Sequence, residues 1–475
     1  MLIYPENPNE FIRPAKDKNL FLRQGVEPKN AQAEGLVLSS EWKTFVNGRE
    51  IITYSTPVTH MGPQSFAVID LESVPLCIEV EYAGPLREAK VLPRELGIGF
   101  EKRDNRICFI IEKASNIVIE ANHSSRSPLA LFVAPQEEVP NPEASNVLWF
   151  APGIHRIDYL ELQEDQILYL APGAIVKAKP PQEGAPYLIE SDWAGKKNYY
   201  DFIFAREKKN IKICGKGMID TSELDWHDRR SMVFSDCSHI TVSGIALIGA
   251  AHWTMPFFGC TEITVENVKI LGYRENSDGI NLVDCAGVSV KNCFIRTGDD
   301  AVCVKSMGLN KRFGSSDIRV SGCIAWNDKV RAFGIAGETR YEIRDVLFED
   351  CQVLSSAADW TREVGALCIV ISDSATIHKV TFRRINIRQE NNYVINCMIM
   401  KDMWSTDMDA GHIEDITFED IHIPENAMIY LEGYDSGHQI RGLHFTGIKS
   451  YETGEEVKLD QYIVKNEYVA LSSML

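Results

Sequence analysis

Short stretches of alternating apolar and polar residues dominate the chain after about residue 147. They share one plan: an alternating strand, a polar or glycine corner and a second short strand. Examples are HITVSGIALIG (239–249), EITVENVKILG (262–272) and GVSVKNCFIRTG (287–298). Alternation with a period of two is typical of β-strands, and no helical periodicity interrupts it. This part of the chain therefore predicts β-structure built from a repeated unit.

An apolar residue marks the same position in each copy of this unit, and successive copies are 23 to 36 residues apart. A repeat of this length indicates a solenoid, a propeller or an array. Because each copy contains only strands and corners, we expect a parallel β-helix with coils stacked about 4.8 Å apart and with the extra residues in loops. The marker positions are Ile211, Ile240, Ile263, Val288, Ile318, Val346, Val380, Ile416 and Leu443.

Half of the 12 cysteines recur at fixed places in the repeat, either three residues before a marker position or five residues after one. The chain has no CxxC pair and no metal-finger spacing between cysteine and histidine. Like side chains in successive coils predict buried ladders of reduced cysteines rather than a disulfide framework. These cysteines are Cys237, Cys260, Cys285, Cys293, Cys323 and Cys351.

The first part of the chain shows a different pattern. WKTFVNGREIITY, SFAVIDL, LCIEVEY, RICFIIE and NIVIEA are short β-type runs, and Asn47-Gly48 is typical of a hairpin turn. A stretch rich in proline and acidic residues, APQEEVPNPEAS, separates these runs from the repeats. We therefore predict an all-β chain, with a small antiparallel β-sandwich domain over residues 1–140 and a parallel β-helix over residues 141–475. The sandwich is interpreted either as a packing domain that caps the β-helix or as a carbohydrate-binding module.

The composition narrows the classes of partner. Acidic residues number 67 and basic residues 49, so the formal net charge of the 475 residues is −18. Such a charge repels nucleic acids and anionic membranes, and we expect neither as a partner. The sequence contains no apolar stretch of about 18 residues, so it predicts no membrane-spanning helix. The first residues lack a secretory signal pattern, so we expect a cytoplasmic protein, or a secreted or periplasmic one if a signal has been removed. The oligomeric state is left open.

Acidic residues gather in ENSDGINLVDCAGVSVKNCFIRTGDDAVCVKS (275–306). Asp278 lies in Asn-Ser-Asp-Gly, and Asp299 and Asp300 lie in a Gly-Asp-Asp that begins about one coil later. The three carboxyl groups should stack on neighbouring coils about 5 Å apart in backbone height, and their repulsion should raise the pKa of at least one. One protonated and one ionised carboxyl group suit glycoside hydrolysis, whereas a calcium site is the competing interpretation.

These motifs resemble glycoside hydrolase family 28, the polygalacturonases, and the related family 49, the dextranases. Their signature is Asn-Thr-Asp-Gly followed one coil later by Gly-Asp-Asp. The resemblance covers roughly residues 147–450, and an N-terminal sandwich is more like the family 49 arrangement. It implies a right-handed parallel β-helix, a carbohydrate substrate, and neither a cofactor nor a metal. Further similar segments are LAPGA (170–174), GKGMID (215–220) followed by Trp226 and Arg230, AHWT (251–254), and Lys305-Ser306.

By this resemblance, Asp299 is the general acid that protonates the glycosidic oxygen. Asp278 and Asp300 hold and deprotonate the attacking water, and the anomeric configuration is inverted. The stacking distance alone does not indicate inversion, since inverting enzymes usually separate their carboxyl groups by about 6.5–9.5 Å. Trp326, Trp360 and Trp404 are weaker candidates for stacking on a sugar. The further candidates for substrate contact are Asn276, Lys305, Arg331, Glu338, His252, Trp253 and Arg274.

Two departures from the family pattern bear on the substrate. The family's Gly-His-Gly should fall near residues 330–338, where Arg331 or Phe333 takes the place of the histidine. Its Arg-Ile-Lys, which binds a galacturonate carboxylate, should fall near residues 365–370, where both cations are missing. We therefore predict an inverting glycoside hydrolase acting on a neutral or mildly acidic glycan. The alternatives are a polysaccharide lyase or epimerase and a non-catalytic carbohydrate-binding β-helix. Cations near the site that remain available for one acidic sugar are Arg274, Arg296, Lys305, Arg331 and Arg340.

Overall fold

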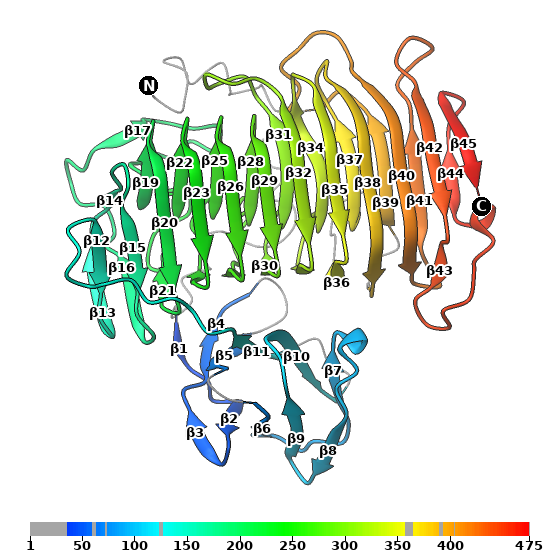
Figure 1. Cartoon of the computed structure of the whole chain (residues 1–475). Coiled ribbons are helices and arrows are strands. Elements are labelled where there is room, and N and C mark those ends of the chain that lie inside the picture. The colour runs from blue at the N-terminus through cyan, green and yellow to red at the C-terminus, as the bar shows by residue number, and fades with distance from the viewer. Residues whose placement is uncertain are drawn as a thin grey trace.

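The structure is a computed structural model that describes residues 36–58, 63–71, 74–122, 127–356, 364–388, 393–402 and 404–474. It is almost entirely β-structure, as predicted. A long stack of coils runs across Figure 1, and a smaller pair of sheets lies below it. Helical structure in the described residues includes two short 3-10 turns, η4 (Arg94–Leu96) and η5 (Leu459–Gln461). No helix in the described part of the chain is long and apolar enough to cross a membrane.

The N-terminal part consists of two sheets that enclose an apolar core of its own. Asn47 and Gly48 both have positive φ and join β2 to β3 in the predicted hairpin. One pairing departs from an antiparallel sandwich, because β5 and β11 run parallel. The chain between them is long enough to cross over, since it also forms part of both sheets. The first sheet has the order β1 (Val37–Leu38), β4 (Tyr54–Thr56), β5 (Gln64–Asp70), β11 (Leu129–Ala134), β10 (Ser115–Ala121), β7 (Ala89–Leu92), and the second has the order β3 (Arg49–Ile51), β2 (Trp42–Val46), β6 (Leu76–Tyr82), β9 (Arg106–Ile111), β8 (Phe100–Arg103).

The remaining strands wind into the predicted parallel β-helix, in which a typical coil contributes one strand to each of three rows. The first two rows are hydrogen-bonded into one 21-stranded sheet, and the third row forms an 11-stranded sheet. The first row is β12 (Val147–Phe150), β15 (Ile167–Leu170), β20 (Lys209–Gly215), β23 (Ser238–Ser243), β26 (Thr261–Glu266), β29 (Ala286–Lys291), β32 (Ser315–Ser321), β35 (Ile343–Glu349), β38 (Thr376–Ile387), β40 (His412–Ile423), β42 (Ile440–Thr446) and β45 (Val469–Met474).

The second row is β13 (Gly153–Ile157), β16 (Ala174–Ala178), β21 (Met218–Asp220), β24 (Ala246–Ile248), β27 (Lys269–Leu271), β30 (Phe294–Thr297), β33 (Ile324–Asn327), β36 (Gln352–Ser356) and β43 (Lys449–Ser450). The third row is β14 (Leu160–Glu161), β19 (Ile203–Arg206), β22 (Met232–Ser235), β25 (Met255–Phe258), β28 (Ile280–Val283), β31 (Val302–Ser306), β34 (Phe333–Thr339), β37 (Leu367–Ile371), β39 (Tyr393–Ile399), β41 (Met428–Glu432) and β44 (Ile463–Lys465). A two-stranded hairpin, β17 (Tyr187–Ile189) and β18 (Asn198–Tyr199), leaves the stack between β16 and β19.

The predicted register is confirmed residue by residue. Each marker position pairs with the next along the first row, from Ile211 with Ile240 to Ile416 with Leu443. The residue before each marker has positive φ, which explains why asparagine, aspartate and glycine are common at that corner.

Like side chains stack along the interior of the coils. Phe348, Phe382, Phe418 and Phe445 form a ladder with ring centroids 4.9–5.1 Å apart. The six recurring cysteines are all buried, and every cysteine of the chain is free. The predicted ladders of reduced cysteines are therefore present, and they fill the core as small apolar groups.

The sandwich packs against the flank of the stack rather than its end. Apolar residues of β5, β10 and β11 contact the second row of coils, where the rings of Phe132 and Phe294 lie 5.1 Å apart. Arg296 is fully buried at this interface, pairs with Asp328 at 3.0 Å, and donates to Gln64 at 2.6 Å. Its guanidinium also lies 4.1 Å from the centroid of the Trp326 ring. Arg296 and Trp326, expected near a sugar, therefore bind the two parts of the chain together.

Candidate active site

The acidic motifs lie in the loops that connect the second row of strands to the third. Asp278 precedes β28, and Asp299 and Asp300 precede β31 in the next coil. Backbone hydrogen bonds hold these loops in register: Gly279 N–H donates to the Asp300 carbonyl oxygen at 2.8 Å. A Cβ at Gly279 would lie 2.4 Å from the carbonyl oxygen of Ala301, so the loop needs glycine there. The close approach explains the glycine that follows the aspartate in the first motif.

The three carboxyl groups come together as predicted, with one oxygen of each within 4.8 Å of the others. Asp278 and Asp300 are each only 2% exposed, whereas Asp299 is partly exposed. Asp278 Oδ2 accepts a hydrogen bond from Asn281 at 2.8 Å, and its buried Oδ1 has no hydrogen-bond partner among the described residues. The trio therefore combines two buried carboxyl groups with one that faces the surface.

Two cations lie against Asp300. Arg331, one coil further along, donates to both of its oxygens at 2.9 and 3.2 Å, and Lys305 Nζ lies 3.8 Å away. Lys305 also pairs with Glu338 at 2.8 Å. Burial works against the charge of Lys305, but Glu338 and the aspartates raise its pKa well above the usual value. The structure thus brings together three of the predicted substrate contacts, Lys305, Arg331 and Glu338, beside the carboxyl trio.

Burial and mutual repulsion raise the pKa values of two of the three carboxyl groups. The pKa of Asp278 rises well above its usual value, because the group is buried and faces Asp299 and Asp300. The pKa of Asp299 rises to about 6 for the same reasons, with Asp300 as its main charged neighbour. The predicted rise is present.

Backbone donors fix the carboxyl group of Asp299. Its Oδ2 accepts a hydrogen bond from Asn276 N–H at 3.0 Å, and its Oδ1 accepts one from Asp300 N–H at 2.8 Å. The side chain of Asn276 is held in turn by Trp253, whose Nε1–H donates to Oδ1 at 2.9 Å. Asn276 and Trp253, both predicted as substrate contacts, are partly exposed beside Asp299.

His252 lies beneath this layer, where it is 9% exposed. Its Nδ1 accepts a hydrogen bond from the Trp253 backbone N–H at 2.7 Å. Burial lowers the pKa of His252 well below the usual value, and the charge of Arg230 acts in the same direction. His252 is therefore a neutral residue that supports Trp253.

Arg274, the last predicted contact, points away from the trio. It is 4% exposed, and its guanidinium donates to the backbone carbonyl oxygens of Ser222, Leu224 and Gly249 at 2.7–2.9 Å. These contacts make Arg274 a brace between loops. Arg340 also lies elsewhere and pairs with Asp407 at 3.1 Å. Trp360 lies outside the described residues.

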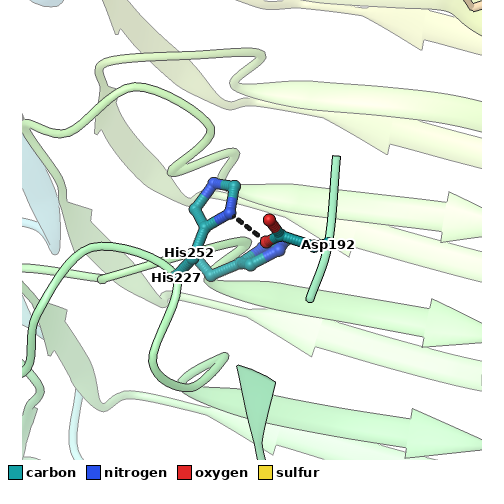
Figure 2. A group of neighbouring side chains, drawn as sticks. All are labelled: Asp192, His227 and His252. Atoms are coloured by element: carbon teal, nitrogen blue, oxygen red, sulfur yellow. Dashed lines mark hydrogen bonds and ion pairs between the residues drawn. The ribbon is translucent and has the colours of Figure 1, made fainter. Parts of the chain in front are cut away.

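The structure adds site residues that the repeat pattern did not indicate. Asp192, from the hairpin between β17 and β18, pairs with His227 at 2.5 Å (Figure 2). His227 in turn contacts Asn276 at 2.9 Å. Trp193 packs edge-on against Trp226 and Trp404, with ring centroids 6.1 and 6.0 Å apart. In the sequence, the one sign of this pair was His227 itself, which directly follows Trp226 in the family-like segment at 215–230.

Two groups have the ligand types of a metal site: the carboxyl trio, and Asp192 with His227 and His252. At the trio, Arg331 and Lys305 already supply positive charge to Asp300, which disfavours Ca²⁺ there. In the second group the oxygens of Asp192 accept four hydrogen bonds, two of them from the backbone. The Asp192 carboxylate is therefore satisfied without a cation, whereas one oxygen of Asp278 in the trio accepts no hydrogen bond from the described residues.

Comparisons with known proteins find similar chains among the polygalacturonases. An exopolygalacturonase from Zea mays is 24% identical over 187 residues, which cover 36% of this chain and 44% of that protein. A polygalacturonase from Prunus persica is 27% identical over 206 residues, which cover 40% of this chain and 47% of that protein. The chain spans about half the length of these curated relatives.

A solved structure, Dex49A from Penicillium minioluteum, is similar over nearly the whole chain. The match covers 94% of this chain and 96% of that one, with a TM-score of 0.62 and 13% identity, and it shows a shared fold. The family model of glycosyl hydrolases family 28 matches residues 183–461, more than half of the chain and including the trio. The resemblance expected from the motifs is thus confirmed, and the chain belongs to glycosyl hydrolases family 28.

Proposed function

We propose that the protein is a glycoside hydrolase that cleaves O-glycosidic bonds of an oligo- or polysaccharide with inversion of the anomeric carbon. The observation that carries this proposal is the carboxyl trio, in which three acids share one site but differ in exposure and in partners. Such differences allow one carboxyl group to donate a proton while another accepts one. Family membership supports the same chemistry.

Asp299 is the proposed general acid. It is the one partly exposed member of the trio, so it is the one that a glycosidic oxygen can reach. Its pKa of about 6 keeps it protonated in mildly acidic solution, and two backbone N–H groups fix its orientation. A fixed, protonated carboxyl group can transfer its proton to the leaving oxygen without first having to reorient.

Asp300 and Asp278 are proposed to hold and deprotonate the attacking water. Asp300 forms an ion pair with Arg331, whose guanidinium contacts both of its oxygens and fixes their position. Asp278 offers a buried oxygen that accepts no hydrogen bond from the described residues. A water bound between them would lose its proton to Asp300 as it attacks the anomeric carbon.

The spacing of the carboxyl groups does not by itself predict inversion. Their nearest oxygens lie within 4.8 Å, which is shorter than the separation of about 6.5–9.5 Å usual for inverting enzymes. Inversion therefore rests on the resemblance to the family. It requires the water held by the two buried carboxyl groups to attack the anomeric carbon from the face opposite the leaving oxygen.

The substrate is proposed to be a neutral or mildly acidic glycan. The relatives named above are polygalacturonases, but the two cations at this site, Lys305 and Arg331, already pair with Glu338 and Asp300. Trp253 is a partly exposed aromatic residue beside Asp299 that can contact a sugar. A lyase or epimerase is not favoured, since these two cations are held by carboxylates rather than available to neutralise a uronate.

The test is a screen of wild-type protein against α-linked oligosaccharides that include dextran, pullulan and pectic fragments, with release of reducing ends as the readout. Asp299→Asn should lose at least about 100-fold in kcat and still bind the active substrate. Asp317→Asn is the matched control, because Asp317 is exposed at a corner with φ 55°, a conformation that asparagine tolerates. Unchanged turnover in Asp299→Asn would refute the assignment.

A further inference from the structure

A continuous hydrogen-bond chain runs from Asp192 to the proposed acid. Asp192 Oδ1 accepts the backbone N–H groups of Ala194 and Lys196 at 2.8 and 2.9 Å, and its Oδ2 accepts from Asn198 Nδ2 at 2.9 Å. The same Oδ2 lies 2.5 Å from His227 Nδ1, the contact drawn in Figure 2. Asp192 is 8% exposed and His227 is fully buried, so solvent does not compete for this contact.

The direction of every bond in the chain follows from one donor. Trp253 Nε1–H can only donate, so the Asn276 atom that it contacts is the oxygen. The other amide atom of Asn276 is therefore its NH₂ group, which donates to His227 Nε2 at 2.9 Å. An Nε2 that accepts carries no proton, so the imidazole of His227 carries its proton on Nδ1 and donates it to Asp192. His227 is thus a neutral imidazole in one tautomer.

Asn276 connects this hydrogen-bond chain to Asp299, the proposed acid. Its φ is 59°, a left-handed conformation that is uncommon for residues other than glycine and is stabilised by side-chain contacts. In this conformation its backbone N–H points at Asp299 Oδ2 at 3.0 Å. Both ends of its amide are held, one by Trp253 and the other by His227. Loss of either contact frees the side chain of Asn276 and loosens the turn next to the acid.

We propose that Asp192 and His227 are positioning residues, which hold Asn276 so that its N–H orients the carboxyl group of Asp299 for proton transfer. The inference rests on the proposed function, in which Asp299 is the acid. It deepens that function by assigning a role to two residues that touch neither Asp299 nor the other two carboxyl groups of the trio in this structure.

A zinc site at the same residues is the competing interpretation, because one carboxylate and two histidines lie within 4.8 Å of one another. Zinc needs a lone pair from each imidazole. Nδ1 of His227 carries a proton and Nε2 accepts from Asn276, while Nδ1 of His252 accepts from Trp253 N–H. Metal binding would therefore break the chain that holds Asn276, and the two interpretations exclude each other.

The proposal predicts a change in the pH profile as well as in rate. The Asn276 N–H favours the ionised form of Asp299, so its loss raises the pKa of Asp299. The charged groups around that carboxyl are Asp300, Asp278 and Arg331, which the variants leave in place. The titratable groups that contact His227 are Asp192 and His252, and Arg230 lies near His252.

The experiment compares Asp192→Asn and His227→Gln with wild type on the active substrate. The amide introduced by Asp192→Asn can donate to Nδ1 of His227, which moves the imidazole proton to Nε2, where it opposes the NH₂ group of Asn276. Each variant should lower kcat about 10- to 100-fold with little change in KM, and should move the basic limb of kcat/KM to higher pH. His378→Gln removes an exposed His–Glu pair of 3.0 Å, away from the site, and should change neither.

A second measurement does not depend on catalysis. In wild-type protein with ¹⁵N-labelled histidine, NMR should show His227 as the neutral Nδ1–H tautomer, assigned by the signal lost in His227→Gln. If wild type hydrolyses nothing, the proposed function fails while the tautomer result stands. The positioning role is refuted by a protonated His227, by stoichiometric zinc that Asp192→Asn abolishes, or by folded variants whose pH limb and kcat match wild type.

Discussion

Replacing Asp299 by asparagine should stabilise the folded protein at neutral pH but not in acid. The pKa of Asp299 is raised from 3.8 to about 6, first by its burial and then by the charge of Asp300. A folded chain with the higher pKa keeps a proton that the unfolded chain has released between these two values. The stabilising contribution is therefore complete below about pH 4 and is lost as the pH rises through about 6. The asparagine variant has no such loss.

The magnitude follows from the pKa and the hydrogen bonds. A rise from 3.8 to about 6 corresponds to about 3 kcal/mol at pH 7. Asparagine offsets about 1 kcal/mol of this, because its NH₂ group cannot accept one of the two backbone N–H groups that Asp299 binds. We expect Asp299→Asn to be about 2 kcal/mol more stable than wild type at pH 7, and up to about 1 kcal/mol less stable at pH 4.

Urea unfolding at pH 4, 5, 6 and 7, followed by tryptophan fluorescence and circular dichroism, measures this difference. With about 2 cal/mol/K of unfolding entropy per residue, the 475 residues give about 1 kcal/mol per kelvin, so Tm at pH 7 should rise by about 2 °C. Asp317→Asn, at an exposed corner, should show no pH-dependent difference from wild type. A difference for Asp299→Asn that stays constant or falls as the pH rises would refute the assignment of a raised pKa.

Three further predictions concern the site and the core. Arg331→Gln removes the main counter-charge of the buried Asp300, so it should cost about 3–5 kcal/mol in denaturant unfolding and abolish hydrolysis; an unaltered unfolding midpoint would contradict the buried ion pair. Phe382→Ala removes one ring of the phenylalanine ladder and should cost about 3–5 kcal/mol while leaving kcat at 25 °C within about twofold, since its coil lies beyond the trio; a selective loss of kcat would place the ladder in the mechanism. Because all cysteines are free, a thiol reductant should leave Tm unchanged, and a lower Tm in reductant would reveal a disulfide.

The coil register could be predicted from the sequence because two independent signals coincide. Alternation sets which residues point inward, and the marker positions such as Ile263 and Val288 set which coils are neighbours. The carboxyl trio followed from the same register, since its two motifs are about one coil apart. At these positions the alternation of residues and the stacking of coils indicate the same neighbours, so the trio could be predicted without knowledge of tertiary contacts.

The rest depends on contacts between segments that share no repeat. Arg296 and Trp326 lie on the outer face of the second row, and only the sandwich packed against that face removes them from solvent. Arg274 binds three backbone carbonyl oxygens. Every residue has such an oxygen, so the sequence does not indicate which residues are its partners. Asp192 reaches His227 from a hairpin outside the coils. In each case a polar residue near the motifs has a structural partner that its own segment does not reveal.

The central claim is that the trio hydrolyses a glycosidic bond with Asp299 as acid and a water activated by Asp300 and Asp278. The most direct test follows the anomeric protons by ¹H NMR during the first minutes of hydrolysis of an α-linked substrate identified in the screen, before mutarotation mixes the products. The β-anomer should appear first, at a rate that Asp299→Asn reduces at least about 100-fold. Initial release of the α-anomer, or an Asp299→Asn variant that works at the wild-type rate, would contradict it.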